Sequence, residues 1–155
     1  MANSLVADTG LIGNAFYLDV DGAPLTMLTS ISGLDIGVEV TNLMQTSADG
    51  KAVWTRTLAA KQTVGTLILT RLAVIDTGSD GIWKWFQETS LKGALDAARK
   101  NGSVVLYGSD STELGRYNFT NGWISKIALD TLDVSSGTPI KETITLEIDF
   151  LERVK

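Results

Sequence analysis

The strongest pattern of hydrophobic and polar positions lies near the C-terminal end of the chain. Between residues 140 and 151, Ile144, Leu146 and Ile148 alternate with polar residues such as Thr145. A period of two places the two kinds of residue on opposite faces of an extended strand. The pattern therefore predicts a long strand that turns one face to a hydrophobic core and the other to polar surroundings.

Shorter stretches with the same period recur along most of the chain. Residues 16–20 alternate clearly and run into Asp21-Gly22, a pair that is typical of a tight hairpin turn. The other segments that we predict to be strands are residues 25–30, 34–41, 65–72, 103–107, 116–121 and 124–129. The fold class predicted from this pattern is mainly β.

One region changes to a helical period. Ser79 and Asp80 are residues that commonly cap helix N-termini, and Ile82, Trp85 and Phe86 follow them at the spacing of one helix face. The hydrophobic spacing continues towards residue 98, although a glycine within it disfavours one unbroken helix. We expect a short helix beside the strands.

Residues 42–61 show neither period. The segment is too long for an ordinary hairpin loop of about two to five residues, and it contains the adjacent hydrophobic residues Val53 and Trp54. Long ordered loops usually have a function, and exposed hydrophobic residues often mark a contact surface. We therefore interpret residues 42–61 as a long loop that contacts another molecule.

Length and composition are those of one folded domain, which we expect to span residues 1–155. The chain has 44% hydrophobic residues, 20% charged residues and a formal net charge of −5. This charge disfavours a protein that binds nucleic acid or anionic lipid through its whole surface. No uncharged stretch approaches the ~20 hydrophobic residues of a membrane-spanning helix, and the first residues lack the positive charge of a secretory signal.

The chain contains neither cysteine nor histidine. Their absence excludes disulfides, zinc sites built from these residues, thiol nucleophiles and the Ser-His-Asp triad. We expect no metal site, no cofactor and no catalytic residue.

Two Asp-Thr-Gly tripeptides, at residues 8–10 and 76–78, keep an aspartic peptidase open as an alternative. In such an enzyme two aspartates share one proton and activate a water molecule. The two copies are spaced unlike those of a two-lobed enzyme, and Asp76 shortly precedes the predicted start of the helix. We favour a turn with a helix-capping residue at residues 76–80.

Several segments, in this order along the chain, are similar to the tail-tube family. They are ISGLDI and VEV at residues 31–36 and 38–40, GTLILTR at residues 65–71, IWKWF at residues 82–86, RKNGSVVL at residues 99–106, YNFTNGW at residues 117–123 and LERV at residues 151–154. The sequence departs from the family pattern at residues 42–61, 76–81 and 147–150. The family forms the inner tubes of contractile phage tails and of extracellular contractile injection systems, and the type VI secretion tube is a more distant relative.

The resemblance implies a two-sheet β-barrel or sandwich with one flanking α-helix, whose copies assemble into hexameric rings that stack into a hollow tube. The implied function is a structural subunit of the inner tube, a conduit for DNA or protein cargo. The implied partners are further copies of the chain, a sheath protein, a baseplate hub or tube-initiator, and a tape-measure protein or cargo in the lumen. Assembly in the bacterial cytoplasm, as part of a phage tail or a released contractile particle, follows from the same likeness. A tube-initiator or adaptor ring of the same fold is the close alternative.

Two surfaces are expected to serve such a tube. The segment at residues 42–61 is expected to contact the neighbouring ring, through Asp49, Lys51, Val53, Trp54 and Arg56. The lumen is expected to be hydrophilic, because an apolar wall would hold cargo by burial instead of letting it slide. The residues expected on the lumen face are Asp35, Glu39, Lys141, Thr143, Thr145, Glu147 and Asp149.

Overall fold

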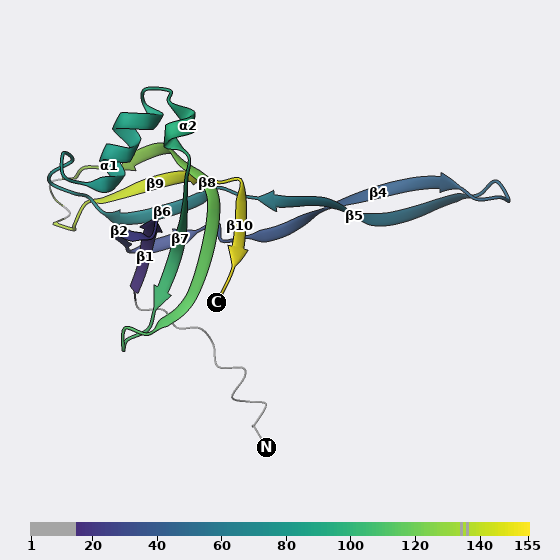
Figure 1. Ribbon diagram of the computed structural model, residues 1–155, viewed down its shortest axis with the longest axis horizontal. Helices are drawn as coiled ribbons and strands as arrows, with labels where there is room; N and C mark the ends of the chain where they lie inside the picture. Colours follow the sequence, from purple (N-terminus) through teal and green to yellow (C-terminus); the bar gives the residue numbers. More distant parts are fainter. Residues whose placement is uncertain (1–14, 134, 136) are drawn as a thin grey trace, which may run out of the picture.

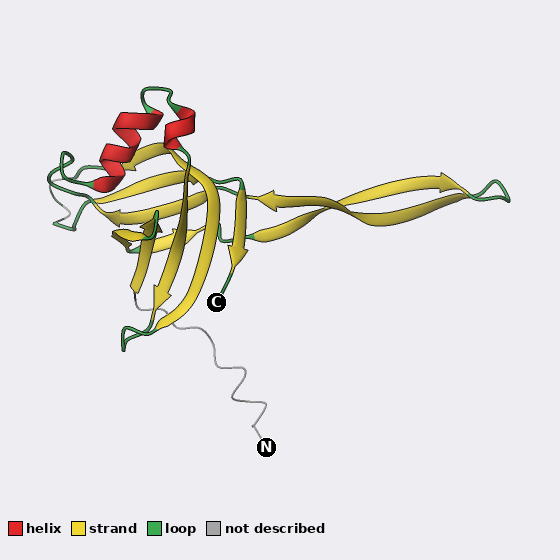
Figure 2. Ribbon diagram, viewed as in Figure 1, coloured by secondary structure: helices red, strands yellow, loops and turns green. Residues whose placement is uncertain are grey.

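The computed structural model describes residues 15–133, 135 and 137–155, and most of these residues form strands (Figure 2). The strands are β1 (Ala15–Val20), β2 (Ala23–Leu28), β3 (Ser30–Ser32), β4 (Ile36–Thr46), β5 (Ala52–Val64), β6 (Leu67–Leu72), β7 (Lys100–Tyr107), β8 (Glu113–Leu129), β9 (Lys141–Glu147) and β10 (Phe150–Arg153). The helical elements are α1 (Gly81–Trp85), the π-helical turn η2 (Phe86–Ser90) and α2 (Leu95–Ala98). The prediction of a mainly β fold is confirmed.

Most strands belong to one strongly bent sheet, whose halves form two layers (Figure 1). The order of hydrogen-bonded neighbours is β2-β1-β7-β8-β9-β6-β3, and β10 lies beside β8. Strand β8 belongs to both layers, because its first half pairs with β7 and β10 and its second half pairs with β9. The sequence predicted two strands here, and the structure has one. Asn121, with a positive φ of 54°, lies within β8, and the strand continues through it.

The bent sheet does not close into a barrel. Its two end strands, β2 and β3, follow each other in the chain, and β2 pairs with β1 while β3 pairs with β6. Thr29, between them, donates its backbone N–H to the carbonyl of Thr70 at 2.7 Å. The expected two-layer arrangement is therefore present, but the hydrogen-bonded strand order remains open.

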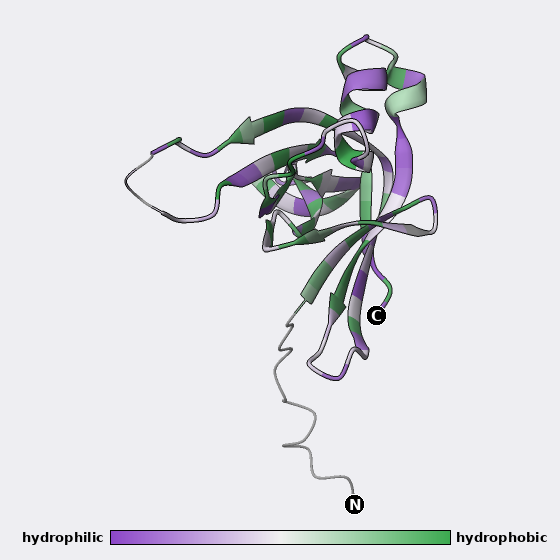
Figure 3. Cartoon of the chain, turned by 90° about the vertical axis from the view of Figure 1, so that its left-hand side faces the viewer, coloured by the Kyte–Doolittle hydropathy of each residue, from purple (hydrophilic) through white to green (hydrophobic). Residues whose placement is uncertain are grey.

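The hydrophobic core lies between the two layers, and the helices cover one end of it. Hydrophobic and hydrophilic positions alternate along the strands (Figure 3), as a sheet with one buried face requires. The buried side chains include Leu18 and Val20 of β1, Leu67 and Leu69 of β6, Val104 of β7, Phe119 and Ile124 of β8, Ile144 and Leu146 of β9, and Leu151 of β10. Ile82 and Trp85 of α1 complete the cluster.

The helical region begins as predicted but is not one helix. Asp80 is the N-cap of α1, and its carboxylate accepts a hydrogen bond from the backbone N–H of Trp83 at 3.0 Å. Helix α1 continues directly into the π-helical turn η2. The helical conformation then ends at Gly93, whose φ is +70°. A positive φ is easily adopted by glycine and is incompatible with a continuing right-handed helix. The expected single flanking helix is therefore a pair of short helices joined through η2.

The C-terminal strand predicted over residues 140–151 is also interrupted. It divides into β9 and β10, and Asp149 between them donates its N–H to the carbonyl of Thr120 at 3.1 Å. The alternation shifts at this break, because Ile148 and Leu151 are buried whereas Phe150 is exposed. A continuous strand would place Phe150 on the face of Ile148, so the break changes which residues reach the core.

Within residues 15–133, 135 and 137–155, none of the helices has the length and apolar character needed to cross a membrane.

Candidate functional surfaces

Strands β4 and β5 form a long hairpin that projects away from the bent sheet (Figure 1). The two strands pair antiparallel from Ile36↔Val64 to Thr46↔Ala52, with one irregularity between Val38 and Val40. The prediction of a long loop at residues 42–61 is therefore wrong. The strand predicted at residues 34–41 is confirmed from Ile36 onwards as the first part of β4. Over residues 42–61 the ribbon is exposed on both sides, so burial imposes no alternation from which its strands could be predicted.

One face of the hairpin carries large hydrophobic side chains in two cross-strand pairs. Val40 lies opposite Leu58, and Met44 lies opposite Trp54. The exposed fractions are 70% for Leu58 and 71% for Trp54. Arg56 lies between the two pairs, opposite Asn42. The hairpin therefore presents hydrophobic patches on either side of a guanidinium group, and no described residue outside the hairpin covers this surface.

The tip of the hairpin is a compact turn. Ser47 donates its backbone N–H to the carbonyl of Lys51 at 2.8 Å, and Gly50 has a φ of +81°. The Ser47 hydroxyl donates to the carboxylate of Asp49, and this hydrogen bond, followed by that of the Lys51 N–H, lowers the pKa of Asp49. The residues expected to contact the next ring are thus divided between two places. Asp49 and Lys51 lie in the turn, whereas Val53, Trp54 and Arg56 lie in β5.

The expected lumen residues of β9 share one face of the sheet. Lys141, Thr143, Thr145 and Glu147 alternate with the buried Glu142, Ile144 and Leu146. The Glu147 carboxylate accepts hydrogen bonds from the hydroxyls of Thr66 at 3.1 Å and Ser125 at 3.3 Å. The side chains that β9 places on this face are hydrophilic and alternate with those that enter the core, whereas β6 adds the exposed Ile68 and Leu72 opposite Thr145 and Lys141.

Three other expected lumen residues lie outside β9. Asp35 lies in the connection between β3 and β4, and Glu39 lies at the irregularity of the hairpin. Asp149 lies in the break between β9 and β10, where it accepts a hydrogen bond from the Asn121 side chain at 3.2 Å. The structure therefore groups the β9 residues and places the other three on separate elements.

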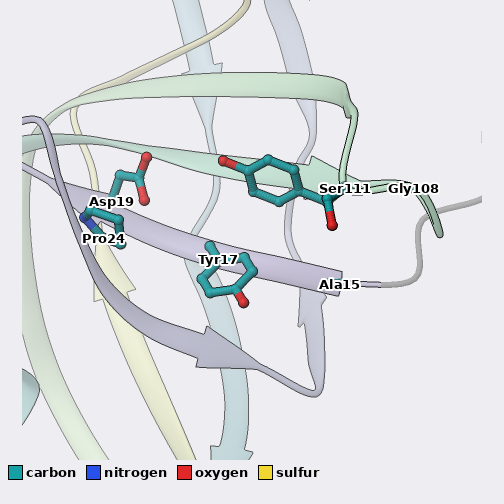
Figure 4. Close-up of a pocket in the computed structure, with 7 residues that line it drawn as sticks. Ala15, Tyr17, Asp19, Pro24, Gly108 and Ser111 are labelled. Carbon is teal, nitrogen blue, oxygen red and sulfur yellow. The ribbon is translucent and has the colours of Figure 1, made fainter.

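A cavity of about 280 Å³ opens on the outer side of β1 and β7 (Figure 4). Tyr17 and Tyr107 lie beside it and meet edge to face, with ring centroids 5.4 Å apart. Asp19 also lines it and lies 3.9 Å from a guanidinium nitrogen of Arg116. The tyrosines shield Val105, whose side chain is buried on this side of the sheet. The cavity thus lies on the solvent side of a small cluster formed by Tyr17, Tyr107 and Val105.

Asp76 has the environment of a turn residue. One of its carboxylate oxygens accepts the N–H of Gly78 and the other accepts the hydroxyl of Ser79, both at 2.9 Å. These bonds shape the approach to α1, as expected of a turn before a capped helix. The other Asp-Thr-Gly tripeptide, at residues 8–10, lies outside the described residues.

A buried ionic network was missed by the sequence analysis. Arg71 of β6 donates to both carboxylate oxygens of Asp80, at 2.9 and 2.7 Å, and to Glu142 of β9 at 2.6 Å. Thr26 of β2 accepts a further bond from Arg71, and the indole N–H of Trp83 donates to Glu142 at 3.3 Å. The network therefore ties α1 to β2, β6 and β9. The sequence did contain a signal for it: Arg71 and Glu142 fall on the strand faces that otherwise carry hydrophobic core residues.

The network also determines how two of its groups ionise. Burial opposes the charge on Asp80, but the hydrogen bonds from Arg71 and from the Trp83 backbone outweigh it, so the pKa of Asp80 is lowered. Burial likewise opposes the charge on Arg71, and its bonds to Asp80 and Glu142 leave the pKa of Arg71 raised. The ion pair is thus charged at neutral pH.

The sequence matches a family model described as T4-like virus tail tube protein gp19, over residues 13–152. The chain belongs to this tail tube protein family. It is a structural subunit of a tail tube. No curated protein matches the sequence.

Solved structures share the fold of this tail tube protein. A chain of the sheath–tube complex of the PVC extracellular contractile injection system in its extended state is 19% identical, with a TM-score of 0.72 and coverage of 99% of this chain and 97% of that chain. A chain of the sheath/tube terminator of the same system is 17% identical, with a TM-score of 0.74 and coverage of 96% and 99%. Hcp1 from Flavobacterium johnsoniae is 20% identical, with a TM-score of 0.53 and coverage of 90% and 94%.

For this tail tube protein the surfaces just described are candidates for contacts within a tube. Among the described residues, no group of three acidic side chains is placed to hold a metal ion. A prominent exposed feature is the apolar face of the hairpin. The hairpin is a separate two-stranded sheet, and its strands are distant from β9 in the sequence.

Proposed function

We propose that this tube subunit forms hexameric rings that stack into a hollow inner tube, and that the β4–β5 hairpin makes the contact between rings. The observation that supports the proposal is the exposed apolar face of the hairpin. A two-stranded ribbon is at best marginally stable alone in water, and its free edges invite pairing with another chain. Further copies of the chain are the natural partner, because a tube is built from one repeated subunit.

The energetic reason is hydrophobic burial. Full burial of a side chain such as leucine contributes roughly 1.5–3 kcal/mol, and Val40, Met44, Trp54 and Leu58 all have most of that contribution still available. Arg56 adds a planar donor that suits a carboxylate on the facing copy. The proposed contact thus combines hydrophobic burial with one charged anchor.

The first prediction concerns Leu58. Leu58→Ser is expected to abolish long tubes while changing the free energy of unfolding of the monomer by less than about 1 kcal/mol, because the side chain is already exposed. Leu91→Ser is the matched control, since Leu91 is 65% exposed but lies outside the hairpin. Electron microscopy measures tube length, and denaturant titration measures stability. Long tubes from the Leu58 variant would contradict the proposed contact.

We further propose that the hydrophilic face of β9 lines the lumen. Lys141, Thr143, Thr145 and Glu147 supply both signs of charge and several hydroxyl groups on one surface. Such a surface holds cargo weakly, which a conduit requires. Asp35, Glu39 and Asp149 remain candidates on separate elements, and the lumen assignment is made for the β9 residues first.

The second prediction tests this assignment by labelling. Because the chain has no cysteine, Thr145→Cys introduces a single thiol. In assembled tubes this thiol is expected to react with a small maleimide and to resist a reagent too bulky to enter the channel. Ser79→Cys, in the exposed turn before α1, is the control and should react with both reagents. Equal reaction of both reagents at position 145 in tubes would place β9 on the outside.

The same proposal includes the remaining partners. A sheath protein would surround the tube, a baseplate hub or tube-initiator would hold its end, and a tape-measure protein or cargo would occupy the lumen. Assembly would take place in the bacterial cytoplasm, and one tail-tube domain would span the chain. A tube-initiator or adaptor ring is the alternative function, and purified protein that forms single rings without stacking would favour it.

A further inference from the structure

One side-chain amide makes the hydrogen bonds that join the hairpin to the rest of the described protein. Gln62 of β5 donates its side-chain N–H to the carbonyl oxygen of Leu151 at 2.6 Å, and its side-chain oxygen accepts the backbone N–H of Leu151 at 3.0 Å. The two residues are far apart in the sequence, and Leu151 lies in the C-terminal strand β10. The amide therefore joins the root of the hairpin to the edge of the bent sheet.

The Gln62 amide binds the backbone of Leu151 in the way that a residue of a neighbouring β-strand would. Leu151 faces Phe119 across the ladder between β10 and β8. In an antiparallel strand, alternate residues turn both backbone polar groups to the same side. Leu151 turns both of its groups away from β8, and the primary amide of Gln62 satisfies the pair. Since Leu151 is fully buried, removing the amide would leave two backbone groups without a partner in a place that water reaches poorly.

Gln62 also lies at the point where the hairpin becomes irregular. It pairs with Val38, and the next aligned pair is Val40 with Leu58. Three residues of β5 thus lie opposite Glu39 alone, an irregularity that bends and twists a ribbon. Of the described residues of β4 and β5, Gln62 is the one that hydrogen-bonds to the rest of the protein. Val64 and Leu34 pack partly against the core at the hairpin base, and between Gln62 and the tip no residue of the ribbon hydrogen-bonds to the described residues outside the hairpin.

We propose that the Gln62 amide is a latch that fixes the direction in which the hairpin leaves the sheet, and that ring stacking depends on this direction. The inference rests on the proposed function of the hairpin. Its physical content is separate, however, because a released hairpin changes orientation even in a single unassembled subunit. Gln62 is thus a positioning residue, which acts on the contact surface without belonging to it.

Gln62→Glu tests the latch with a change of almost no volume. Above the pKa of the introduced carboxyl, the group accepts from the Leu151 N–H but repels the Leu151 carbonyl oxygen, so the latch is lost. When protonated, the same group can donate to that oxygen and accept from that N–H, so the latch returns. The repulsion and the partial burial raise the pKa of the introduced carboxyl above the ordinary ~4.3 of glutamate.

Other charged groups near the latch require wild-type measurements at each pH. Glu39 and Lys61 line a shallow cavity beside Gln62, and Glu152 and Arg153 follow Leu151 on β10. These groups are common to wild type and variant. Gln45→Glu provides the matched control, because it makes the same substitution at an exposed position of the hairpin.

The first readout is the orientation of the hairpin in the unassembled protein. Spin labels on Lys51→Cys at the tip and Ser79→Cys on the body give one distance distribution by pulsed electron paramagnetic resonance. We expect a narrow distribution for wild type and for the Gln45→Glu control. For Gln62→Glu we expect a broad distribution at pH 8 that narrows again near pH 5. An unchanged narrow distribution at pH 8 would overturn the latch.

The second readout is tube yield by electron microscopy. Gln62→Glu is expected to lower the yield by about tenfold or more at pH 8, since the hydrogen bond to the Leu151 carbonyl oxygen is lost and replaced by repulsion from the carboxylate, and to recover it near pH 5. If Gln62→Glu releases the hairpin while tubes still form normally, the dependence of stacking on the latch is wrong. If the latch behaves as expected but Leu58→Ser also leaves tubes intact, the proposed role of the hairpin fails independently of the latch.

Discussion

Replacing Arg71 with methionine is expected to lower the free energy of unfolding by about 3–5 kcal/mol, the usual effect of removing one partner of a buried ion pair. The Arg71 side chain is 3% exposed, and the carboxylates of Glu142 and Asp80 are 2% and 13% exposed. Methionine keeps the unbranched stem of the side chain but lacks the guanidinium group, so the loss includes all of the ion pairs and hydrogen bonds that this group makes. Both carboxylates would remain poorly solvated and without their cation. Denaturant titration of the unassembled protein measures the change.

The control for this prediction is Arg99→Met. Arg99 is exposed at the end of α2, so the same substitution there is expected to change stability by no more than about 0.5 kcal/mol. A triple variant, Arg71→Met with Asp80→Asn and Glu142→Gln, is expected to recover part of the loss, because neutral groups cost less to leave unpaired. A stability loss at Arg71 no greater than at Arg99 would show that the network contributes little.

The same network predicts how the protein responds to acid. Because the pKa of Asp80 is lowered in the folded protein, its contribution to stability is present above the ordinary carboxyl pKa near 3.9. It is lost as pH falls through the lower pKa of the folded state. Asp80→Asn should therefore be less stable than wild type at pH 7, and the difference should shrink below about pH 4. Stability curves against pH would show this convergence.

The sequence predicted the parts of the fold in which one face of a strand is buried. Ile144 and Leu146 of β9 enter the core at alternate positions, and so do Leu67 and Leu69 of β6. Burial imposes the period of two, so the period reveals the strand. The capped start of α1 was predicted for a similar local reason, since Asp80 bonds to a backbone N–H only three residues away.

The hairpin could not be predicted in the same way. The alternation seen at Val38 and Val40 does not continue towards the tip, because the adjacent residues Leu43 and Met44 are both exposed in the single chain. In the proposed contact these side chains pack against another copy of the chain. A surface shaped by assembly leaves a weak periodic signal in the sequence of one subunit.

Contacts between distant residues were the other part that the sequence did not reveal. Gln62 is an ordinary polar residue in its local sequence, and its role depends on Leu151 lying beside it in space. The Arg71 network gave a partial signal, because Glu142 falls on the same strand face as Ile144 and Leu146. A carboxylate on a core face needs a buried cation, but the pattern alone does not say which one.

Gly33→Ala, which adds one carbon atom at the root of the hairpin, is expected to lower the free energy of unfolding substantially. Gly33 lies between β3 and β4, and its φ is +88°, a region that residues with a Cβ rarely adopt. A Cβ at this position would lie 2.1 Å from the carbonyl oxygen of Thr66, in the segment that leads from β5 to β6. The two connections of the hairpin cross here at backbone distance, so relief of the clash requires one of them to move.

Gly22→Ala separates the two causes of this loss. Gly22 has a similar φ of +81°, but nothing lies within 4 Å of its added Cβ. The positive φ alone is expected to cost about 1 kcal/mol of unfolding free energy at Gly22. Gly33→Ala adds the displacement of packed backbone, for a total of about 2–4 kcal/mol. Thermal unfolding of the two variants measures the difference in stability.

Because the displaced segment is the hairpin root, tube length should also fall for Gly33→Ala and not for Gly22→Ala. Equal stability and equal tube length in the two variants would mean that the close approach to Thr66 does not constrain the hairpin.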